Sequence, residues 1–567
     1  MLFGAKSPVK MRYLVVCGGT VSGIGKGTAV SCIGVILKAC GYRVTAIKID
    51  PYLNVDAGTM SPTEHGEVFV LDDGGEVDLD LGNYERFLNV TLSKDHNITT
   101  GKVYLKIIQD ERQGNYLGRT VQVVPHVTDA IQDWIKKVAM IHVGDAEAGG
   151  SPARVSSQFA EPDVCLIEIG GTVGDIEGSA YFEAIRQLAL KEGPRGLCLG
   201  FVSYVPYLSH IGESKTKPTQ HGVKELRALG LSPDFILCRS EVELSESAKQ
   251  KVALFSNLRE DRVLSLHNQS SIFYVPELLE SQGFSQMVCE IMGLEARTPK
   301  LESWLNLAHI ISRIEAEASA VHIAIVGKYT GLKDSYLSVI KALEHASYAE
   351  KKKLVLDWVD SETLEGEDDN EGWSLIKDAH GILIPGGFGT RGVEGKIRAA
   401  NYARTHNKPY LGICLGLQIA VIEYARNVLN VPAATSQEFN AETEAPYIVF
   451  MPEIDQVKMG GTMRLGTRNC LLKEGSLASS LYFNASVISE RHRHRYEVNP
   501  DKVEELEAGG LVFSGKDLDS IRMEIIELPS HKFFFGTQFH PEFKSKPFAP
   551  SPPFHAFVKA SIKEIVS

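Results

Sequence analysis

The chain has 567 residues, of which 44% are hydrophobic and 23% are charged, and its formal net charge at pH 7 is -12. This length exceeds one ordinary hydrophobic core and favours two domains, and the composition is that of a globular protein. The acidic balance argues against a general nucleic-acid binder, although a nucleoside triphosphate needs only a local basic pocket.

The nine cysteines are scattered and include no CxxC pair, so a zinc site of the usual spacing is not expected. Dispersed cysteines in a long chain favour a reducing compartment. No apolar run approaches the roughly 20 residues that span a bilayer. The first ten residues lack the apolar stretch of a secretory signal, so we interpret them as a tail and expect a cytoplasmic protein.

The first half alternates short β-branched runs with helix-length segments such as Gly27–Ala39. This alternation predicts an α/β domain with a mostly parallel sheet flanked by helices. The predicted buried strands are Arg12–Cys17, Arg43–Ile49, Val164–Ile169 and Asp234–Cys238.

A glycine-rich stretch joins the first predicted strand to the first helix, from Gly18 to Thr28. Glycines let backbone N–H groups turn toward phosphate oxygens, and a helix N-terminus adds partial positive charge. Lys26 is placed to reach terminal phosphates, as in P-loops. The match is imperfect, because Thr20 replaces the first glycine and Gly27 follows the lysine. The alternative is a plain strand-to-helix turn, which rarely carries Gly-Lys-Gly.

Two acidic residues and one basic segment add to this half. Glu168 ends a predicted strand, on the side of a parallel sheet where ligands bind. Magnesium with a nucleotide takes one or two carboxylates, but for Asp80 on its own a solvated turn is the favoured explanation. The segment Gly212–His221 is a possible second triphosphate clamp, and an exposed basic loop explains it about as well.

The pattern changes near residue 300. The stretch SWLNLAHIISRIEAEA predicts an amphipathic linker helix, with Leu305, Ile310, Ile311 and Ile314 near one face. A second α/β series follows, with predicted strands at Val321–Val326, Lys353–Val359, Gly381–Ile384 and Pro409–Ile413. The predicted domains are a tail (1–10), a first domain (11–296), a linker (297–320) and a second domain (321–567).

Two further segments carry no predicted function. The acidic run Ser361–Gly372 is interpreted as a solvated surface loop, and Gly144–Phe159 as a mobile insertion.

The second half contains a candidate cysteine nucleophile. Cys414 stands between a predicted strand and helix, flanked by Gly412 and Gly416, in the layout of a nucleophile elbow. The helix N-terminus favours the thiolate. His540 is a candidate base and Glu542 can orient its imidazole, which completes a Cys-His-Glu triad. The stretch PGGFG (385–389) and the N–H of Leu415 are candidates for an oxyanion hole. A buried structural cysteine explains these three elements poorly.

The motifs PGGFG, GICLGLQ and FHPE, in this order, resemble those of the class I glutamine amidotransferases over about residues 320–567. The segments SGIGKG, GRTVQVVPH, EIGGTVGDIE and KTKPTQHGVKEL resemble the amidoligase domain of the CTP synthases over about residues 11–290. The resemblance implies a P-loop-like synthetase domain joined to a glutaminase domain. It implies ATP-dependent amination of UTP to CTP through a phosphorylated UTP, with ammonia channelled from glutamine. It also implies Mg²⁺, feedback by CTP, activation by GTP bound between the domains, and a homotetramer.

The resemblance also assigns roles to matching positions. It places ATP on Ser22, Gly23, Ile24, Gly25, Lys26, Gly27, Lys48, Asp80 and Arg239, with the metal on Asp80 and Glu168. It places UTP or CTP on Ser22, Asp175, Ile176, Glu177, Lys215, Thr216, Lys217, Pro218, Thr219, Gln220 and Lys251. It places glutamine on Gly387, Leu415, Gly416, Leu417, Gln418, Glu438 and Arg495, and His65 at the mouth of an ammonia tunnel.

Two alternatives stay open at this point. One is another glutamine- and ATP-dependent ligase, such as a cobyrinate-type amidase, against which the KTKPTQ and EHGEVFV segments favour UTP. The other is a filament-forming protein that has lost catalysis. The intact residues Lys26, Asp80, Glu168 and the Cys-His-Glu triad argue against such a loss, while filaments remain compatible with activity.

Overall fold

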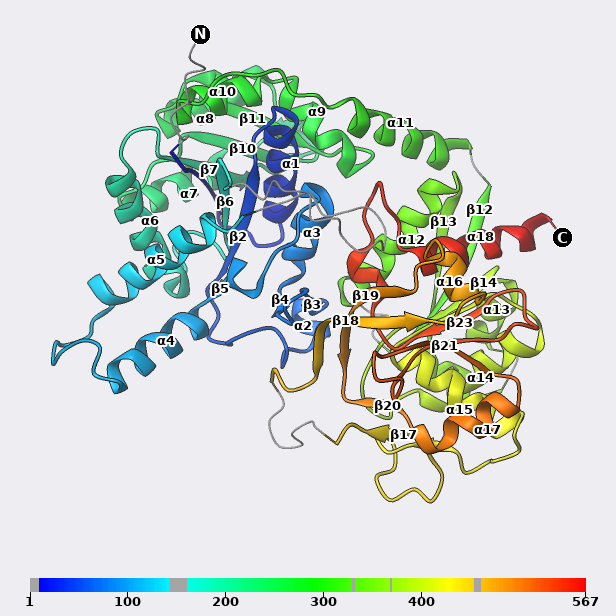
Figure 1. The fold of residues 1–567 in the computed structure, drawn as a ribbon. Helices are drawn as coiled ribbons and strands as arrows, with labels where there is room; N and C mark the ends of the chain where they lie inside the picture. The colour runs from blue at the N-terminus through cyan, green and yellow to red at the C-terminus, as the bar shows by residue number, and fades with distance from the viewer. Residues whose placement is uncertain are drawn as a thin grey trace, which may run out of the picture. The chain divides into compact units, whose positions relative to one another are not determined.

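The computed structural model describes residues 10–142, 161–317, 319–328, 332–367, 370–452 and 460–566. The chain forms two compact units (Figure 1). Among the described residues, the first unit comprises 10–56, 83–142 and 161–312, and the second comprises 57–82 and the described part of 313–566. The N-terminal nine residues and the whole of the predicted insertion Gly144–Phe159 lie outside the described residues.

The first unit is built on a seven-stranded sheet whose neighbouring strands are all parallel, in the order β11-β10-β7-β1-β6-β2-β5. Its strands are almost entirely buried and mostly apolar, as expected for a sheet covered on both faces. They are β1 (Arg12–Gly18), β2 (Val44–Asp50), β5 (Asn97–Thr99), β6 (Val164–Ile169), β7 (Leu197–Tyr204), β10 (Phe235–Ser240) and β11 (Val263–His267). The hairpin strands β8 (Tyr207–Leu208) and β9 (Glu213–Ser214) form a small separate pair.

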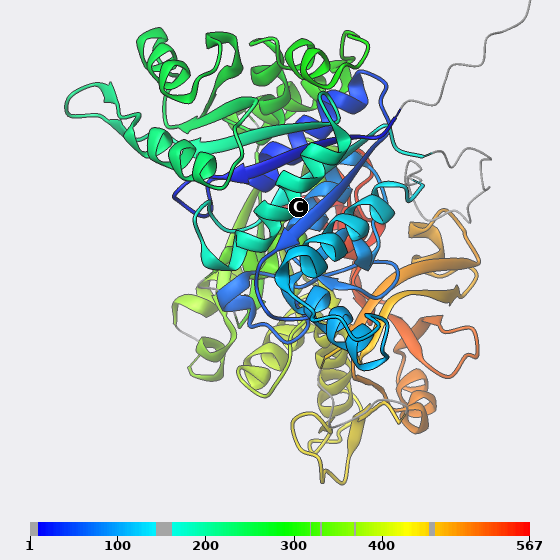
Figure 2. The same ribbon diagram turned by 90° about the vertical axis from the view of Figure 1, so that its left-hand side faces the viewer.

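Helices cover both faces of this sheet (Figures 1 and 2). One face packs against α5 (Thr128–Ala139), α6 (Ser179–Glu192), α7 (Lys217–Ala228) and α8 (Glu246–Ser256) in one continuous apolar core. Contacts to the strands also come from α1 (Lys26–Ala39), α9 (Val275–Glu280) and α10 (Phe284–Met292). The remaining helices are α3 (Leu79–Leu88), α4 (Thr100–Arg112) and α11 (Glu302–Glu317).

The second unit is built on a nine-stranded sheet in the order β13-β12-β14-β15-β23-β22-β21-β18-β19. Its first five strands are parallel: β13 (Lys353–Asp360), β12 (Ala320–Gly327), β14 (Gly381–Ile384), β15 (Tyr410–Ile413) and β23 (Phe534–Thr537). The other four pair antiparallel: β22 (Met523–Glu527), β21 (Val512–Lys516), β18 (Arg464–Leu472) and β19 (Val487–His494). The sheet is therefore mixed.

Helices also flank this second sheet. One core contains α13 (Glu371–Asp378), α14 (Val393–Thr405) and α15 (Leu415–Asn427), and the other contains α12 (Leu337–Ala349), α16 (Leu477–Leu481) and α18 (Pro552–Val566). Smaller elements are α2 (Pro62–His65), α17 (Val503–Ala508), the pair β3 (Phe69–Val70) and β4 (Glu76–Val77), and the strands β16 (Thr435–Ser436), β17 (Pro446–Phe450) and β20 (Tyr496–Val498).

The α/β class with two helix-flanked sheets is confirmed, but three details differ from expectation. The second sheet is half antiparallel, because its C-terminal strands are joined by short connections, as between β21 and β22, rather than by crossover helices. Ile310 of the predicted helix face is 39% exposed, whereas Ile311 and Ile314 are buried. The acidic run 361–372 is not a simple solvated loop, because it begins with a short 3-10 helix whose Ser361 is buried.

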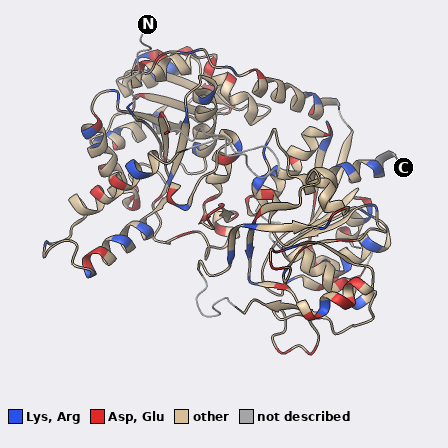
Figure 3. Cartoon of the chain, viewed as in Figure 1, with Lys and Arg blue, Asp and Glu red and all other residues tan. Residues whose placement is uncertain are grey.

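Two surface properties follow from the described residues. Acidic and basic side chains are interspersed along most elements in the view of Figure 3. Within the described ranges, no helix has the length and apolar character needed to cross a membrane. The predicted domain limits remain a prediction, and the grouping of residues 57–82 with the second unit was not anticipated.

Candidate active site

Three neighbouring strands of the second unit end at the same edge of its sheet. β14, β15 and β23 pair in parallel, so the segments that follow them emerge side by side. These segments are the loop 385–389, the elbow at Cys414 and the stretch leading to His540. The N–H of Cys414 donates to the carbonyl of Thr537 over 2.6 Å, which ties the elbow to β23. Parallel pairing therefore gathers residues that lie more than 150 positions apart in the sequence.

Cys414 occupies a sharp turn between β15 and α15, with φ 52° and ψ -99°. Such a conformation is uncommon for a residue with a side chain and costs on the order of 1–3 kcal/mol. Two glycines make room for it. A Cβ on Gly416 would lie 2.2 Å from the carbonyl oxygen of Ile384, and one on Gly412 would lie 2.6 Å from the backbone of Gly416. The turn thus depends on small residues on both sides of the cysteine.

The imidazole of His540 is held by Glu542, whose Oε1 lies 2.7 Å from Nδ1. Burial lowers the pKa of His540, but the Glu542 carboxylate and an interaction with Cys414 outweigh burial and raise it to about 10. The Nε2 atom is buried and makes no hydrogen bond among the described residues. A Cβ built on Gly386 would lie 3.6 Å from both Cys414 Cβ and His540 Nε2, so the two residues flank the same point.

The thiol of Cys414 has two further neighbours. Its Sγ lies 3.8 Å from the carbonyl oxygen of Arg493 and accepts from Gln538 Nε2 at 3.6 Å. Gln538 was not singled out from the sequence, although it directly precedes the FHPE motif. Gln418 Nε2 donates to the carbonyl of Tyr496 and to Gln538 Oε1, which joins α15 to the segment after β23.

The other predicted glutamine contacts lie around this edge. Glu438 Oε1 accepts the N–H of Gly389 at 2.6 Å, and burial raises the pKa of Glu438. Arg495 follows β19 and acts electrostatically on Glu438. A Cβ on Gly387 would make only an ordinary contact with Leu415 at 3.6 Å. The first helical turn after Cys414 supplies Leu415, Gly416, Leu417 and Gln418.

Residues 57–82 contribute to the second unit through three acidic side chains. Glu67 accepts from the N–H of Ser338 at 2.7 Å, Asp72 pairs with Arg491 at 2.5 Å, and Glu76 pairs with Arg493 at 2.9 Å. Desolvation alone would raise the pKa of Asp72, but Arg491 and Lys544 lower it to about 2. This packing was not predicted, although the acidic residues of 57–82 and the basic run RHRHR at 491–495 carry complementary charge.

Two predicted residues of this same segment have local roles in the structure. His65 ends the four-residue helix α2 and is exposed. Asp80 lies in the first turn of α3, where its N–H donates to Asp78 Oδ1 at 2.9 Å. Both residues group with the second unit, whereas Lys26 and Glu168 group with the first, and the shared ATP and metal site of Asp80, Lys26 and Glu168 stays a prediction.

In the first unit the glycine-rich stretch after β1 turns directly into α1. Gly23 and Gly25 have left-handed backbones, with φ of 69° and 86°, and Gly25 caps the helix. Lys26 is 8% exposed, and its Nζ donates to the carbonyl of Gly171 at 2.7 Å, in the loop after the adjacent strand β6. The predicted stretch Ser22, Gly23, Ile24, Gly25, Lys26 and Gly27 therefore forms a helix N-terminus at the ligand-binding edge of a parallel sheet.

A buried charge cluster lies beside this loop. Lys48 on β2 is the register partner of Glu168 on β6, and its Nζ lies 3.1 Å from Glu168 Oε1. The hydroxyl of Tyr84 donates to the other carboxylate oxygen, and Asp50 lies 3.9 Å from Lys48. Asp50 and Tyr84 were missed, because a lone Asp or Tyr in a sequence carries no distinguishing signal.

The carboxylates of this cluster are possible ligands for a magnesium ion. Among the described residues, no group of three His, Cys, Asp or Glu side chains is placed to hold a metal. Magnesium with a nucleotide needs only one or two carboxylates, because phosphate oxygens and water supply the rest. The hard carboxylate oxygens of Glu168, next to the Lys26 loop, fit that donor set.

The remaining predicted nucleotide contacts lie in a loop, on a strand and on two helices of the first unit. The Asp175 carboxylate accepts from the N–H and hydroxyl of Thr172 at 2.7 and 2.8 Å, and Ile176 and Glu177 beside it are exposed. Arg239 on β10 donates to Asn268 Oδ1 at 2.6 Å. The basic segment begins α7 and includes Lys215, which pairs with Glu213, followed by Thr216, Lys217, Pro218, Thr219 and Gln220, while Lys251 lies on α8.

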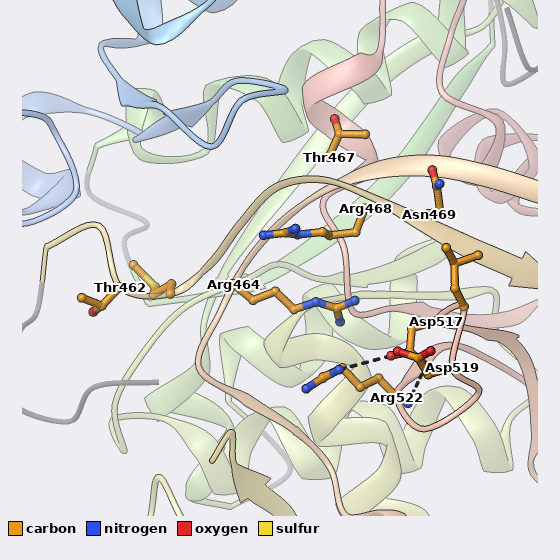
Figure 4. Close-up of a pocket in the computed structure, with 10 residues that line it drawn as sticks. Thr462, Arg464, Thr467, Arg468, Asn469, Asp517, Asp519 and Arg522 are labelled. Carbon is orange, nitrogen blue, oxygen red and sulfur yellow. Dashed lines mark hydrogen bonds and ion pairs between the residues drawn. The ribbon is translucent and has the colours of Figure 1, made fainter. Parts of the chain in front are cut away.

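A cavity of about 630 Å³ lies elsewhere in the second unit, along β18 and the β21–β22 connection (Figure 4). Arg464, Arg468, Arg522, Asp517 and Asp519 line it together with smaller residues. Arg464 also pairs with the buried Glu524 at 2.6 Å. The lining includes none of the predicted catalytic or glutamine-binding residues.

Comparison with known proteins identifies the family. The family model for the CTP synthase N-terminus matches residues 12–294, and the class I glutamine amidotransferase model matches residues 331–560. CTP synthase of Dictyostelium discoideum is 52% identical, covering 98% of this chain and 100% of that protein. CTP synthase 1 of Homo sapiens is 50% identical, covering 97% of this chain and 93% of that protein. The chain belongs to the CTP synthase family.

A solved structure, described as Trypanosoma brucei CTPS, glutaminase domain with bound acivicin, is 41% identical with a TM-score of 0.41 and covers 43% of this chain and 94% of that one. Membership of the CTP synthase family accounts for both halves of the chain, a synthetase domain and a glutamine amidotransferase domain. It makes the protein a glutamine-hydrolysing ligase and removes the cobyrinate-type alternative.

The first prediction concerns the elbow. Gly416→Ala should destabilise the protein by about 1–3 kcal/mol, because its methyl group meets a backbone carbonyl that cannot move freely. In an ordinary helix, alanine is more stabilising than glycine by about 1 kcal/mol. A lower free energy of unfolding in Gly416→Ala would therefore indicate steric crowding. Thermal unfolding measures it, with Gly387→Ala as the matched control that should leave the melting temperature unchanged. Equal melting temperatures for the wild type and Gly416→Ala would contradict the predicted clash between the added methyl group and the Ile384 carbonyl.

The second prediction concerns the His540–Glu542 pair. The raised pKa keeps the imidazole protonated through neutral pH, and this state is lost only as the pH rises toward about 10. Glu542→Gln removes the carboxylate, so the pKa of His540 falls. The alkaline limb of the kcat/KM profile for glutamine hydrolysis should move to lower pH, with at least about tenfold lower activity. Glu490→Gln, at another buried glutamate, should leave that limb in place. An unmoved limb in Glu542→Gln would refute the assignment.

Proposed function

We propose that the chain aminates UTP at C4 to form CTP, consuming ATP and taking ammonia from glutamine. The observation that carries the proposal is the grouping of Cys414 with the buried His540–Glu542 pair at one sheet edge. The glycine-rich loop ending in Lys26, beside Glu168, supports the ATP-dependent half. The printed names of the full-length relatives support the choice of UTP and CTP.

In the glutaminase half, the thiolate of Cys414 attacks the amide carbon of glutamine. The resulting oxyanion is stabilised by N–H groups of Gly387 and Leu415, and the imidazolium of His540 gives its proton to the departing ammonia. Water then attacks the thioester, with His540 as general base, and releases glutamate. Glu542 holds the imidazole in one orientation throughout. Glu438 and Arg495 bind the charged groups of the glutamine.

In the synthetase half, the C4 oxygen of UTP attacks the γ-phosphate of ATP, which releases ADP and leaves a phosphorylated UTP. Ammonia then adds at C4 and inorganic phosphate leaves with that oxygen, giving CTP. Phosphorylation is required because the unmodified oxygen is a poor leaving group. Lys26 and the glycine N–H groups stabilise the transferred phosphoryl charge. A magnesium ion held by Glu168, and by Asp80 in the family pattern, would neutralise phosphate charge when bound.

The remaining ligand assignments belong to the same proposal. Arg239 and Lys48 contact ATP. The triphosphate of UTP, or of CTP as inhibitor, binds the segment 215–220 with Lys251, and residues 175–177 read the base. His65 stands on the route of the ammonia. GTP acts as an activator, and the protein works in the cytoplasm as a homotetramer that is compatible with filaments.

The direct test supplies UTP, ATP, Mg²⁺ and either glutamine or ammonium, and follows CTP by chromatography and glutamate by a coupled assay. CTP formed with both nitrogen donors supports the proposal. Glutamate without CTP under both conditions would reduce the function to that of a glutaminase.

Cys414→Ala should abolish glutamine-dependent CTP formation by at least about a thousandfold, because the nucleophile is gone. The rate with ammonium should stay within about twofold, since the two chemistries use separate sites. Cys470→Ala, at another buried cysteine of the same unit, is the control for substituting a buried thiol. Equal losses with both donors, in a variant that melts like the wild type, would show that the two sites do not act separately.

Lys26→Ala should lower CTP formation with either donor by at least about a hundredfold, because the charge that stabilises phosphoryl transfer is removed. Glutamate release at Cys414 should persist. Lys191→Ala, at an exposed surface lysine of the same unit, should retain full activity. Normal CTP formation by Lys26→Ala would contradict the assignment of this glycine-rich loop to the phosphates of ATP.

A further inference from the structure

Lys328 lies at the sheet edge that carries the triad. It directly follows β12, which pairs in parallel with β14, so it emerges beside the loop 385–389 that follows β14. Its side chain is 6% exposed, and its Nζ donates to the carbonyl oxygens of both Phe388 and Gly389. A buried ammonium thus holds two successive carbonyls of this loop.

The same loop is held from its other side by a carboxylate. Glu438 Oε1 accepts the N–H of Gly389 at 2.6 Å. Within the peptide unit that joins Phe388 to Gly389, Lys328 therefore binds the C=O and Glu438 binds the N–H. A trans peptide carries these two groups on opposite sides of one plane, so a positive and a negative group fix its orientation.

The position of Lys328 is itself fixed by its backbone. Its N–H donates to the hydroxyl of Tyr336 at 3.1 Å, and its carbonyl accepts from the guanidinium of Arg391. Burial lowers the pKa of Lys328, and Glu438 acts in the opposite direction. The charges that face it are Glu438, Arg391 and Glu362.

The glycines of this loop do not by themselves fix its backbone conformation. Gly389 has a left-handed backbone with φ 77°, and a Cβ there would meet nothing within 4 Å. Gly386, at the other end, lies against the His540 ring, where a Cβ would approach Cε1 to 2.8 Å. A rotation of the Phe388–Gly389 peptide would therefore be transmitted to the N–H of Gly387, which lies between these points.

We infer that Lys328 is a positioning residue for the oxyanion hole: with Glu438 it clamps the Phe388–Gly389 peptide and so aims the N–H of Gly387 at the tetrahedral oxyanion. The inference rests on the glutamine chemistry proposed above. It predicts that Lys328 affects acyl transfer at Cys414 without affecting the thiol itself.

Lys396 provides a matched control within the same cluster. It lies on α14 and is 2% exposed, and its side-chain ammonium makes no hydrogen bond to any residue that the structure describes. Burial together with Lys328 and Arg391 lowers its pKa to about 7. Lys396→Met and Lys328→Met therefore remove the same type of buried side chain, but only the second removes the donor to the loop.

The test uses the full-length enzyme and measures glutamate release, ammonium-dependent CTP formation and iodoacetamide alkylation of the Cys414 peptide by mass spectrometry. For Lys328→Met we expect kcat for glutamine to fall by about 10- to 100-fold, since one oxyanion donor is worth about 10²–10³ in kcat. The fall in kcat should exceed any rise in KM, with Cys414 alkylation and ammonium-dependent activity unchanged. Lys396→Met should stay within about twofold for all three measurements.

Three outcomes would overturn the inference: an unchanged kcat in Lys328→Met, an equal fall in both lysine variants, or a fall accompanied by lost Cys414 alkylation. If Lys328→Met does not fold, Lys328→Gln, which is shorter and uncharged, should show the same selective fall in kcat. A wild type that releases glutamate but makes no CTP would reject the proposed function, while the Lys328 test would still stand on glutamate release alone.

Discussion

The left-handed backbone at Cys414 is the constraint on which the glutaminase site depends. It lets β15 lead into α15 without a connecting loop, so that Cys414 directly follows the strand and is also the N-cap of the helix. That turn tolerates no side chain at Gly412 or Gly416, and it places the thiol where the ends of β14 and β23 also arrive. The turn at Cys414 thus places the thiol next to the loop 385–389 and His540.

Parallel pairing also explains why so much of this site could be predicted from the sequence. The segments that follow neighbouring strands of a parallel sheet lie at one edge of that sheet. In this chain those segments are the PGGFG loop, the glycine-flanked cysteine and the FHPE stretch. The same reasoning placed Glu168 at the end of β6, beside the loop of Lys26. The first helix and the strands β1, β2, β6 and β10 were predicted to within a few residues, because buried strands carry continuous apolar runs, whereas β5, β7 and β11 were not predicted.

Other features lacked a local signal. The antiparallel half of the second sheet lies beyond Ile413, where polar and charged residues interrupt the apolar pattern. Lys328 is one lysine after a strand, and only the neighbouring strand order brings it to Phe388 and Gly389. Tyr84 reaches Glu168 from 84 positions away in the sequence. These contacts depend on three-dimensional packing between distant segments, which periodicity along the chain does not encode.

The placement of residues 57–82 bears on how separable the two halves of this chain are. A gene fusion of two enzymes suggests modules that could be cut apart near residue 300. Such a cut would take Asp72 and Glu76 away from Arg491 and Arg493, although Arg491 is only 3% exposed. The isolated C-terminal piece would have to hydrate or neutralise the buried Arg491 guanidinium, which is unfavourable for a desolvated charge. The contacts of the second unit therefore do not begin at the linker near residue 300 alone, because residues 57–82 also belong to it.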